Sequence, residues 1–184
     1  MNVSDRDKWL LNLYRNSELH GALLMGRLAR SLAQLDLLVN VTRHAATEAR
    51  HAAMLTDTIA ALGGDLDPRA ATIQEHYAAK GGVPAALADL LVLSEVLEKR
   101  VLATYRAHVA RGGVHPQVEA TLRAILREME DEEHDEHAGW IDRALDALPH
   151  ATVEAAESKW RAVDAAVAAE LEATVRERFP EAAS

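Results

Sequence analysis

Two stretches rich in histidine and carboxylate carry the residues of this sequence that are best suited to metal chemistry. The first, ATEARHAAML, places Glu48 three residues before His51. Residues three apart share one face of a helix, about 5–6 Å apart at Cβ, so a carboxylate oxygen and an imidazole nitrogen can bind one ion. The second stretch, EMEDEEHDEHAGW over residues 128–140, concentrates carboxylates around two histidines. The second stretch alone also fits the solvated acidic face of a helix, and the Glu48–His51 spacing alone can arise by chance in any helix that carries Glu and His.

Two further glutamates interrupt segments that otherwise have the pattern of a helix core. Glu18 follows Tyr14 within SELHGAL, and Glu98 precedes LATY, with Glu95 one turn earlier as a substitute. A lone buried carboxylate costs free energy unless it is paired or bound to a cation. A dinuclear carboxylate site takes one Glu from each of two helices and a Glu-x-x-His from each of the other two. Glu18, Glu98 and the pair at residues 48–51 match three of these four contributions.

The fourth contribution is expected from residues 128–140. Continuing the apolar positions on both sides of the acidic run selects His137 together with Glu133, whereas Asp131 with His134 gives a poorer register. The residue three before His137 is His134, and Glu133 stands four before it, so a regular Glu-x-x-His is missing. Either a π-bulge brings Glu133 or Glu132 into line, or His134 is itself a ligand. The remaining acidic residues are expected to face water: Glu128, Asp131, Glu132, Asp135 and Glu136.

Two tyrosines lie one or two helical turns from the single glutamates. Tyr14 precedes Glu18 by four residues and Tyr105 follows Glu98 by seven. At these distances the phenols can donate hydrogen bonds to the carboxylates or take part in redox chemistry. The alternative is core packing with each hydroxyl group hydrogen-bonded.

Glycine and proline divide the sequence into an all-α arrangement. The expected long helices cover residues 4–31, 36–62, 83–111, 116–148 and 152–179, with a short helical turn at 74–79. Asp36 is expected to be the N-cap of the second helix, and Pro84 to lie in the first turn of the third.

The links between the helices predict the topology. Short links make helices one and two, and helices three and four, antiparallel neighbours, whereas residues 63–82 separate the two pairs. Two hairpins joined by a long crossover form a ferritin-like four-helix bundle, and a plain up-down bundle is the alternative. We expect the bundle to span residues 1–150, and the amphipathic helix of residues 151–184 to pack on it or on a partner subunit.

Composition limits the partners, the location and the metal ligands that can be expected for this chain. The net charge of −9 argues against nucleic acid as a partner. No apolar run approaches the ~20 residues of a membrane span and no signal-peptide block is evident, so a cytoplasmic protein without membrane contact is expected. The absence of cysteine removes disulfides and thiolate ligands, which leaves carboxylate and imidazole as metal ligands.

With these motifs, the chain resembles the ferritin-like superfamily, specifically the rubrerythrin-type di-iron carboxylate proteins without a rubredoxin domain. The resemblance is carried by SELHGAL, ATEARHAAML, LEKRVLATY and DEEHDEHAGWI and covers residues 5–148. It implies two iron ions, with manganese or a mixed pair as alternatives, that react with dioxygen or peroxide. The implied ligands are Glu18, Glu48, His51, Glu98, His137 and a carboxylate near Glu133. Because the chain has no cysteine, electrons are expected from a separate donor.

The resemblance leaves several functions open. We favour an iron-dependent oxidase, oxygenase or peroxidase that acts on an unknown small molecule, with a homodimer suggested by the apolar face of the last helix. A ferroxidase or iron-storage cage is the alternative, and a metal-free helical interaction module is the non-catalytic one. A hemerythrin-like site fits poorly, because it needs more histidines on the third helix than His108 supplies.

Overall fold

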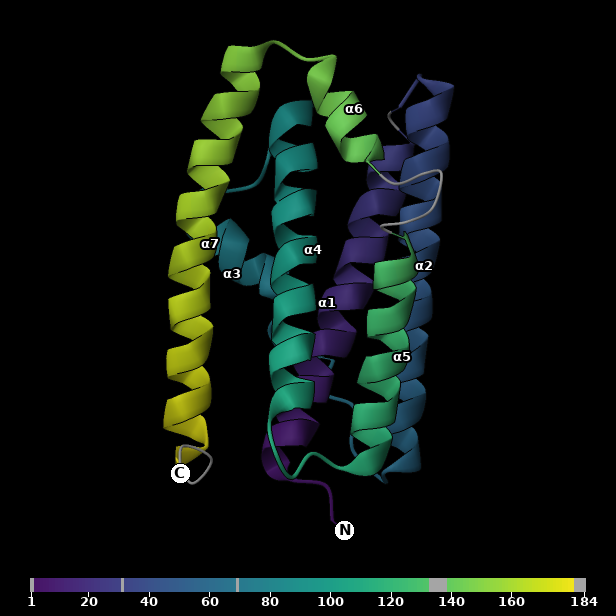
Figure 1. The fold of residues 1–184 in the computed structure, drawn as a ribbon, viewed down its shortest axis with the longest axis vertical. Coiled ribbons are helices and arrows are strands. Elements are labelled where there is room, and N and C mark those ends of the chain that lie inside the picture. Colours follow the sequence, from purple (N-terminus) through teal and green to yellow (C-terminus); the bar gives the residue numbers. More distant parts are fainter. Residues whose placement is uncertain (1, 31, 69, 133–138, 181–184) are drawn as a thin grey trace. The chain divides into compact units, whose positions relative to one another are not determined.

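The computed structural model describes residues 2–30, 32–68, 70–132 and 139–180. Every regular element in these ranges is a helix, which confirms the all-α class (Figure 1). The helices are α1 (Asp5–Ala29), α2 (Leu35–Ala61), α3 (Ile73–Gly81), α4 (Leu87–Ala110), α5 (Pro116–Glu132), α6 (Trp140–Asp146) and α7 (His150–Arg178). They belong to two compact units. Unit 1 comprises Met1–Gln74 and Leu102–Trp140, and unit 2 comprises Glu75–Val101 and Ile141–Ser184.

The ends of the first two helices follow local capping chemistry. Ser4 caps α1, because its hydroxyl accepts a 3.0 Å hydrogen bond from the backbone N–H of Asp7. The prediction that Asp36 caps α2 is wrong: Gln34 holds the N-cap position without a side-chain hydrogen bond, and Asp36 lies in the first turn. There its negative charge still favours the positive end of the helix dipole. Gly63, with φ of 64°, follows α2 as expected.

Two expected helix boundaries need correction. The helix expected from residue 83 begins only at Leu87, where the carbonyl of Ala86 accepts the first helical hydrogen bond from Leu90. The expected single helix over residues 116–148 is wrong, because α5 and α6 are separate. Gly139 stands just before α6 with φ of 69°, in the left-handed region that is incompatible with the interior of a right-handed helix.

The core of unit 1 forms where α1 and α2 pack side by side and α5 lies along α2 (Figure 1). The periodic apolar positions of these helices are buried, which is the main source of stability for an amphipathic helix. They include Leu11, Tyr14, Met25, Val41, Ala52, Leu55, Ile59, Val118, Leu122 and Ile125. This packing fixes the helix faces on which the candidate ligands lie.

Buried polar side chains of α1 hold the connection that follows α2. The Nδ2 of Asn12 donates to the carbonyl of Asp65 at 3.2 Å, and its Oδ1 accepts from the N–H of Asp67 at 2.7 Å. Ser17 accepts from the N–H of Ile73 at 2.9 Å through its hydroxyl. These bonds satisfy backbone groups that would otherwise be buried without partners, so they fix the connection to the side of α1.

Unit 2 is organised around Trp160 of α7. The indole is fully buried, and its N–H donates to Asp89 Oδ1 of α4 at 2.8 Å. Gly81, at the end of α3, lies directly against the ring. Tyr77 of α3 is also fully buried and donates its hydroxyl proton to Asp164 of α7.

Replacing Gly81 with alanine is expected to lower the free energy of unfolding by about 1–3 kcal/mol. The added Cβ would lie 2.6 Å from Cζ3 of Trp160 and 3.1 Å from Cγ2 of Val163, and a buried, hydrogen-bonded indole has little freedom to move away. Urea unfolding measures the change. Gly112→Ala is the control, because no described atom lies within 4 Å of its added Cβ. Equal stability of the two variants would contradict the packing described for unit 2.

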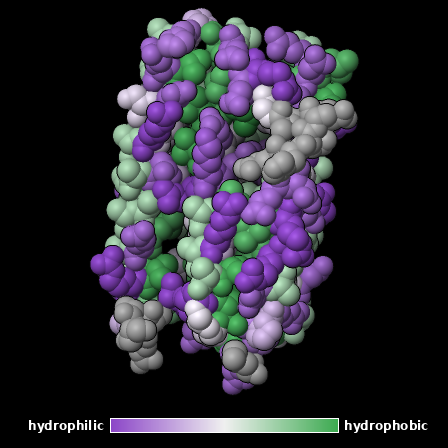
Figure 2. Space-filling view, viewed as in Figure 1, coloured by the Kyte–Doolittle hydropathy of each residue, from purple (hydrophilic) through white to green (hydrophobic). Residues whose placement is uncertain are grey.

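Hydrophilic and hydrophobic residues alternate over the face drawn in Figure 2, as is usual for helices with one exposed side. Leu23 and Leu35 are the most exposed large aliphatic residues of α1 and α2, at 58% and 70%. None of the described helices combines the length and the hydrophobicity that crossing a bilayer requires.

Candidate functional site

Glu18 and His51 meet at the buried interface between α1 and α2. The Nδ1 atom of His51 lies 3.5 Å from Oε2 of Glu18, and both side chains are at least nine-tenths buried. The structure therefore brings together two of the residues that sequence reasoning selected, one from each helix of the first hairpin.

Glu48 joins them through a space that a glycine leaves open. A Cβ on Gly21 would lie only 2.2 Å from Oε1 and 2.8 Å from Oε2 of Glu48, so this carboxylate occupies the place of a side chain on α1. Gly21 is three residues after Glu18 and shares its helix face. The two carboxylates therefore lie over neighbouring turns of α1. Nε2 of His44 lies 3.6 Å from Oε1 of Glu48.

Glu128 of α5 also reaches this cluster, so the expectation that it points to water holds only in part: its side chain is 35% exposed. Its Oε2 lies 3.3 Å from Nε2 of His51 and accepts a 2.9 Å hydrogen bond from Nε of Arg50. Among the described residues, none makes a hydrogen bond of good geometry with Nε2 of His51. The inward position of Glu128 could have been found from the apolar face of α5: Ile125 is fully buried, and Glu128 follows it by three residues on the same face.

Tyr105 of α4 also contacts the cluster. Its hydroxyl donates a 2.6 Å hydrogen bond to Oε1 of Glu18, and its ring is 1% exposed. Burial, together with the negative charges of Glu18 and Glu48, raises the pKa of Tyr105 well above its ordinary value of 10. The phenol therefore stays protonated at neutral pH and acts as a hydrogen-bond donor to the carboxylate.

A second buried cluster lies beyond Tyr105 and was not anticipated from the sequence. His108 of α4 bridges two groups of α1: its Nε2 lies 3.0 Å from Oδ1 of Asp7, and its Nδ1 lies 3.2 Å from the hydroxyl of Tyr14. Arg111 also donates to Asp7. The sequence does contain a sign of this cluster: Asp7 precedes Tyr14 by seven residues, so the two residues lie on the same face of a helix.

The remaining predicted ligands lie elsewhere. Glu98 is half-buried on α4 within unit 2, and its relation to the unit 1 cluster stays a prediction. Glu133, His134 and His137 lie outside the described residues, and their roles stay predictions as well. Within the described residues, no three or more histidine, aspartate or glutamate side chains lie close enough together to hold a metal ion.

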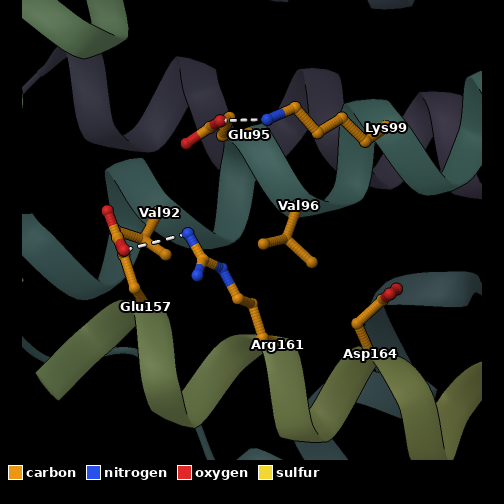
Figure 3. A pocket seen from close by; sticks show the side chains of 7 residues that line it. All are labelled: Val92, Glu95, Val96, Lys99, Glu157, Arg161 and Asp164. Atoms are coloured by element: carbon orange, nitrogen blue, oxygen red, sulfur yellow. Dashed lines mark hydrogen bonds and ion pairs between the residues drawn. The ribbon is translucent and has the colours of Figure 1, made fainter. Parts of the chain in front are cut away.

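Unit 2 contains a surface groove between α4 and α7 (Figure 3). Its lining residues are Val92, Glu95, Val96, Lys99, Glu157, Arg161 and Asp164. Two ion pairs within the helices, drawn as dashed lines in Figure 3, compensate four of the charges. Asp164 accepts from Nε and Nη2 of Arg100 at 2.8 and 2.7 Å. Because its charged groups already have partners of opposite sign, the groove is a weaker candidate for ligand binding than the unit 1 cluster.

Comparisons of the chain with protein-family models, with curated proteins and with solved structures found no match. The chemistry of the unit 1 cluster therefore carries the functional interpretation. That cluster gathers carboxylates and an imidazole from α1, α2 and α5, with a phenol donor from α4. This combination of groups suits a first-row transition metal better than magnesium or calcium.

Proposed function

We propose that unit 1 forms the described part of a dinuclear metal site and that the protein is a ferritin-like, iron-dependent oxidoreductase. One observation carries the proposal: Glu18 and His51 meet at a buried interface, and Gly21, one turn after Glu18, leaves room on the same helix face for the carboxylate of Glu48. As part of this proposal, α1, α2, α4 and α5 form the four-helix bundle, with α3 in the long crossover.

The donor atoms of His51 support an assignment of roles. Glu18 faces Nδ1 and Glu128 faces Nε2, so the two carboxylates flank opposite nitrogens of one ring. A histidine ligand binds metal through one nitrogen and usually donates the other N–H to a carboxylate that fixes the ring. Nδ1 of His51 would accordingly bind metal beside Glu18 and Glu48. Glu128, which Arg50 holds in place, would orient the ring from the Nε2 side.

The residues around these ligands would tune the site. Tyr105 donates to Oε1 of Glu18, which leaves Oε2 facing His51. A bound iron pair would supply redox chemistry with dioxygen or peroxide, and the chain's carboxylates would adjust their binding as the oxidation state changes. Electrons would come from a separate donor, because the chain contains no cysteine for an iron–sulfur or rubredoxin-like centre.

Gly21→Ala tests the proposal without removing a ligand. The new Cβ would displace the Glu48 carboxylate, which is the movable end of a flexible side chain, so the fold should persist while affinity for Fe(II) or Mn(II) falls. A loss of about 10–100-fold is expected, as for changes that misorient metal ligands. Chelator competition measures the affinity, and circular dichroism reports the fold.

Gly26→Ala is the matched control on the same helix. No described atom lies within 4 Å of its added Cβ, so metal affinity should stay unchanged while the free energy of unfolding rises by about 0.5–1 kcal/mol. Equal metal affinity in the two variants would show that Glu48 is not a ligand.

A further inference from the structure

Asp7, His108 and Tyr14 form a hydrogen-bonded chain inside unit 1. Their exposed fractions are 0%, 4% and 1%. Nε2 of His108 lies 3.0 Å from Oδ1 of Asp7, and Nδ1 of His108 lies 3.2 Å from the hydroxyl of Tyr14. Apolar side chains could fill this space at a lower cost, because burying a carboxylate, an imidazole or a phenol removes a polar group from water.

The direction of each hydrogen bond follows from the charge of Asp7. Burial alone would raise the pKa of Asp7, but hydrogen bonds from His108 and Ser4 and the positive charge of Arg111 act in the opposite direction, and the pKa is lowered. An ionised carboxylate only accepts, so Nε2 of His108 carries the donated proton. In the neutral ring Nδ1 is then an acceptor, and the hydroxyl of Tyr14 donates to it.

Tyr14 also lies next to the ring that contacts the candidate ligands. Its centroid is 4.6 Å from that of Tyr105, whose hydroxyl is bonded to Glu18. The two rings therefore connect the carboxylate cluster with the imidazole through direct aromatic contact.

Among the three tyrosines of the chain, Tyr14 has the strongest base as its partner. Tyr105 and Tyr77 donate to the carboxylates of Glu18 and Asp164. An imidazole, with an ordinary pKa of about 6.5, binds a proton more strongly than a carboxylate, whose pKa is about 4. The burial that raises the pKa of Tyr14 also prevents its proton from leaving to solvent, so this proton needs a partner inside the protein.

We propose that Tyr14 is a redox-active tyrosine that gives one electron to a one-electron oxidant while its phenolic proton moves to Nδ1 of His108. The O–H bond of Tyr14 breaks and an N–H bond forms on His108. The products are a neutral tyrosyl radical and an imidazolium paired with Asp7, and the oxidant is reduced by one electron. Tyr105 provides the aromatic path towards Glu18. The inference rests on the proposed function only for the natural oxidant, which would be the metal centre.

Flash oxidation of the metal-free, full-length protein tests the inference independently of the metal site. A photogenerated ruthenium(III) tris-bipyridine complex is the oxidant, and freeze-quench electron paramagnetic resonance detects the radical. Because the chain has three tyrosines, single Tyr→Phe variants assign the signal. Tyr14→Phe should lose the tyrosyl signal, whereas Tyr77→Phe and Tyr105→Phe should keep it. A tyrosyl signal that persists in Tyr14→Phe would overturn the proposal.

The proton acceptor is tested separately. In His108→Gln the amide can still accept a hydrogen bond but cannot take the proton, so radical formation should slow by about a hundredfold. Asp164→Asn, which alters the partner of Tyr77 instead, should leave the rate unchanged. If His108→Gln does not fold, the wild-type rate in heavy water decides: a coupled proton transfer slows there, and an unchanged rate would contradict the role of His108.

Discussion

Asp7→Asn is expected to lower the free energy of unfolding by about 3–5 kcal/mol, the usual cost of removing one partner from a buried ion pair. The Asp7 carboxylate is fully buried, accepts from Nε2 of His108 at 3.0 Å and pairs with Arg111. Asparagine keeps the shape and a carbonyl oxygen that can still accept from these donors, but it removes the negative charge and places N–H donors where the second carboxylate oxygen was. Urea unfolding at neutral pH measures the loss.

Asp5→Asn is the matched control in the same helical turn. Asp5 is 88% exposed and forms a surface ion pair with Lys8 at 3.2 Å, so its replacement should change the free energy of unfolding by less than about 1 kcal/mol. Similar losses in the two variants would show that the buried charge of Asp7 contributes no special stability.

The lowered pKa of Asp7 also predicts a pH dependence. A carboxylate whose pKa is lower in the folded state contributes stability that is fully present above its ordinary pKa, 3.8 for Asp7, and is lost as the pH falls through the lowered value. The free energy of unfolding of the wild type should therefore fall more steeply below about pH 4 than that of Asp7→Asn. Parallel acid profiles would contradict the assignment.

Glu18→Gln is expected to reduce affinity for Fe(II) or Mn(II) by more than about a hundredfold, more than the loss of a supporting group. Glutamine keeps the volume and can still accept from Tyr105, but it presents no negative charge to the ion. Glu128→Gln should cost about 10–100-fold if, as proposed, Glu128 orients His51 without binding metal. Glu157→Gln, in unit 2, should bind metal like the wild type. Chelator competition measures all three.

Equal losses in Glu18→Gln and Glu128→Gln would exclude the assignment of His51 Nδ1 to the metal and Nε2 to Glu128. Such a result would instead place both carboxylates among the ligands. Unchanged affinity for metal in both variants would show that no metal binds at this face of α1.

Sequence pattern predicted the helices well where one local signal acts alone. α1 begins at Asp5, close to the expected residue 4, and Gly63 follows α2, because helix ends such as these depend on neighbouring residues. His51 of the predicted Glu48–His51 pair meets Glu18 at 3.5 Å, whereas the role of the pair as metal ligands stays a prediction. The break at Gly139 was missed because an isolated glycine within an apolar pattern is also tolerated inside helices.

The parts of the site that were missed depend on contacts between helices. Glu128 stands in an acidic run in which the apolar period alone does not separate inward from outward positions. His108 stands near the end of α4 and gains its partners, Asp7 and Tyr14, only from α1. The room for the Glu48 carboxylate depends on the missing side chain of Gly21, which a one-helix pattern cannot reveal.

Metal content is the most direct measurement of the central claim. The wild-type protein, purified from cells grown with added iron and manganese, is analysed by elemental mass spectrometry beside Glu48→Ala. A dinuclear site predicts about two ions per wild-type chain and a large loss in the variant. Less than about a tenth of an equivalent in the wild type, unchanged in Glu48→Ala, would contradict a metal site built on Glu18, Glu48 and His51.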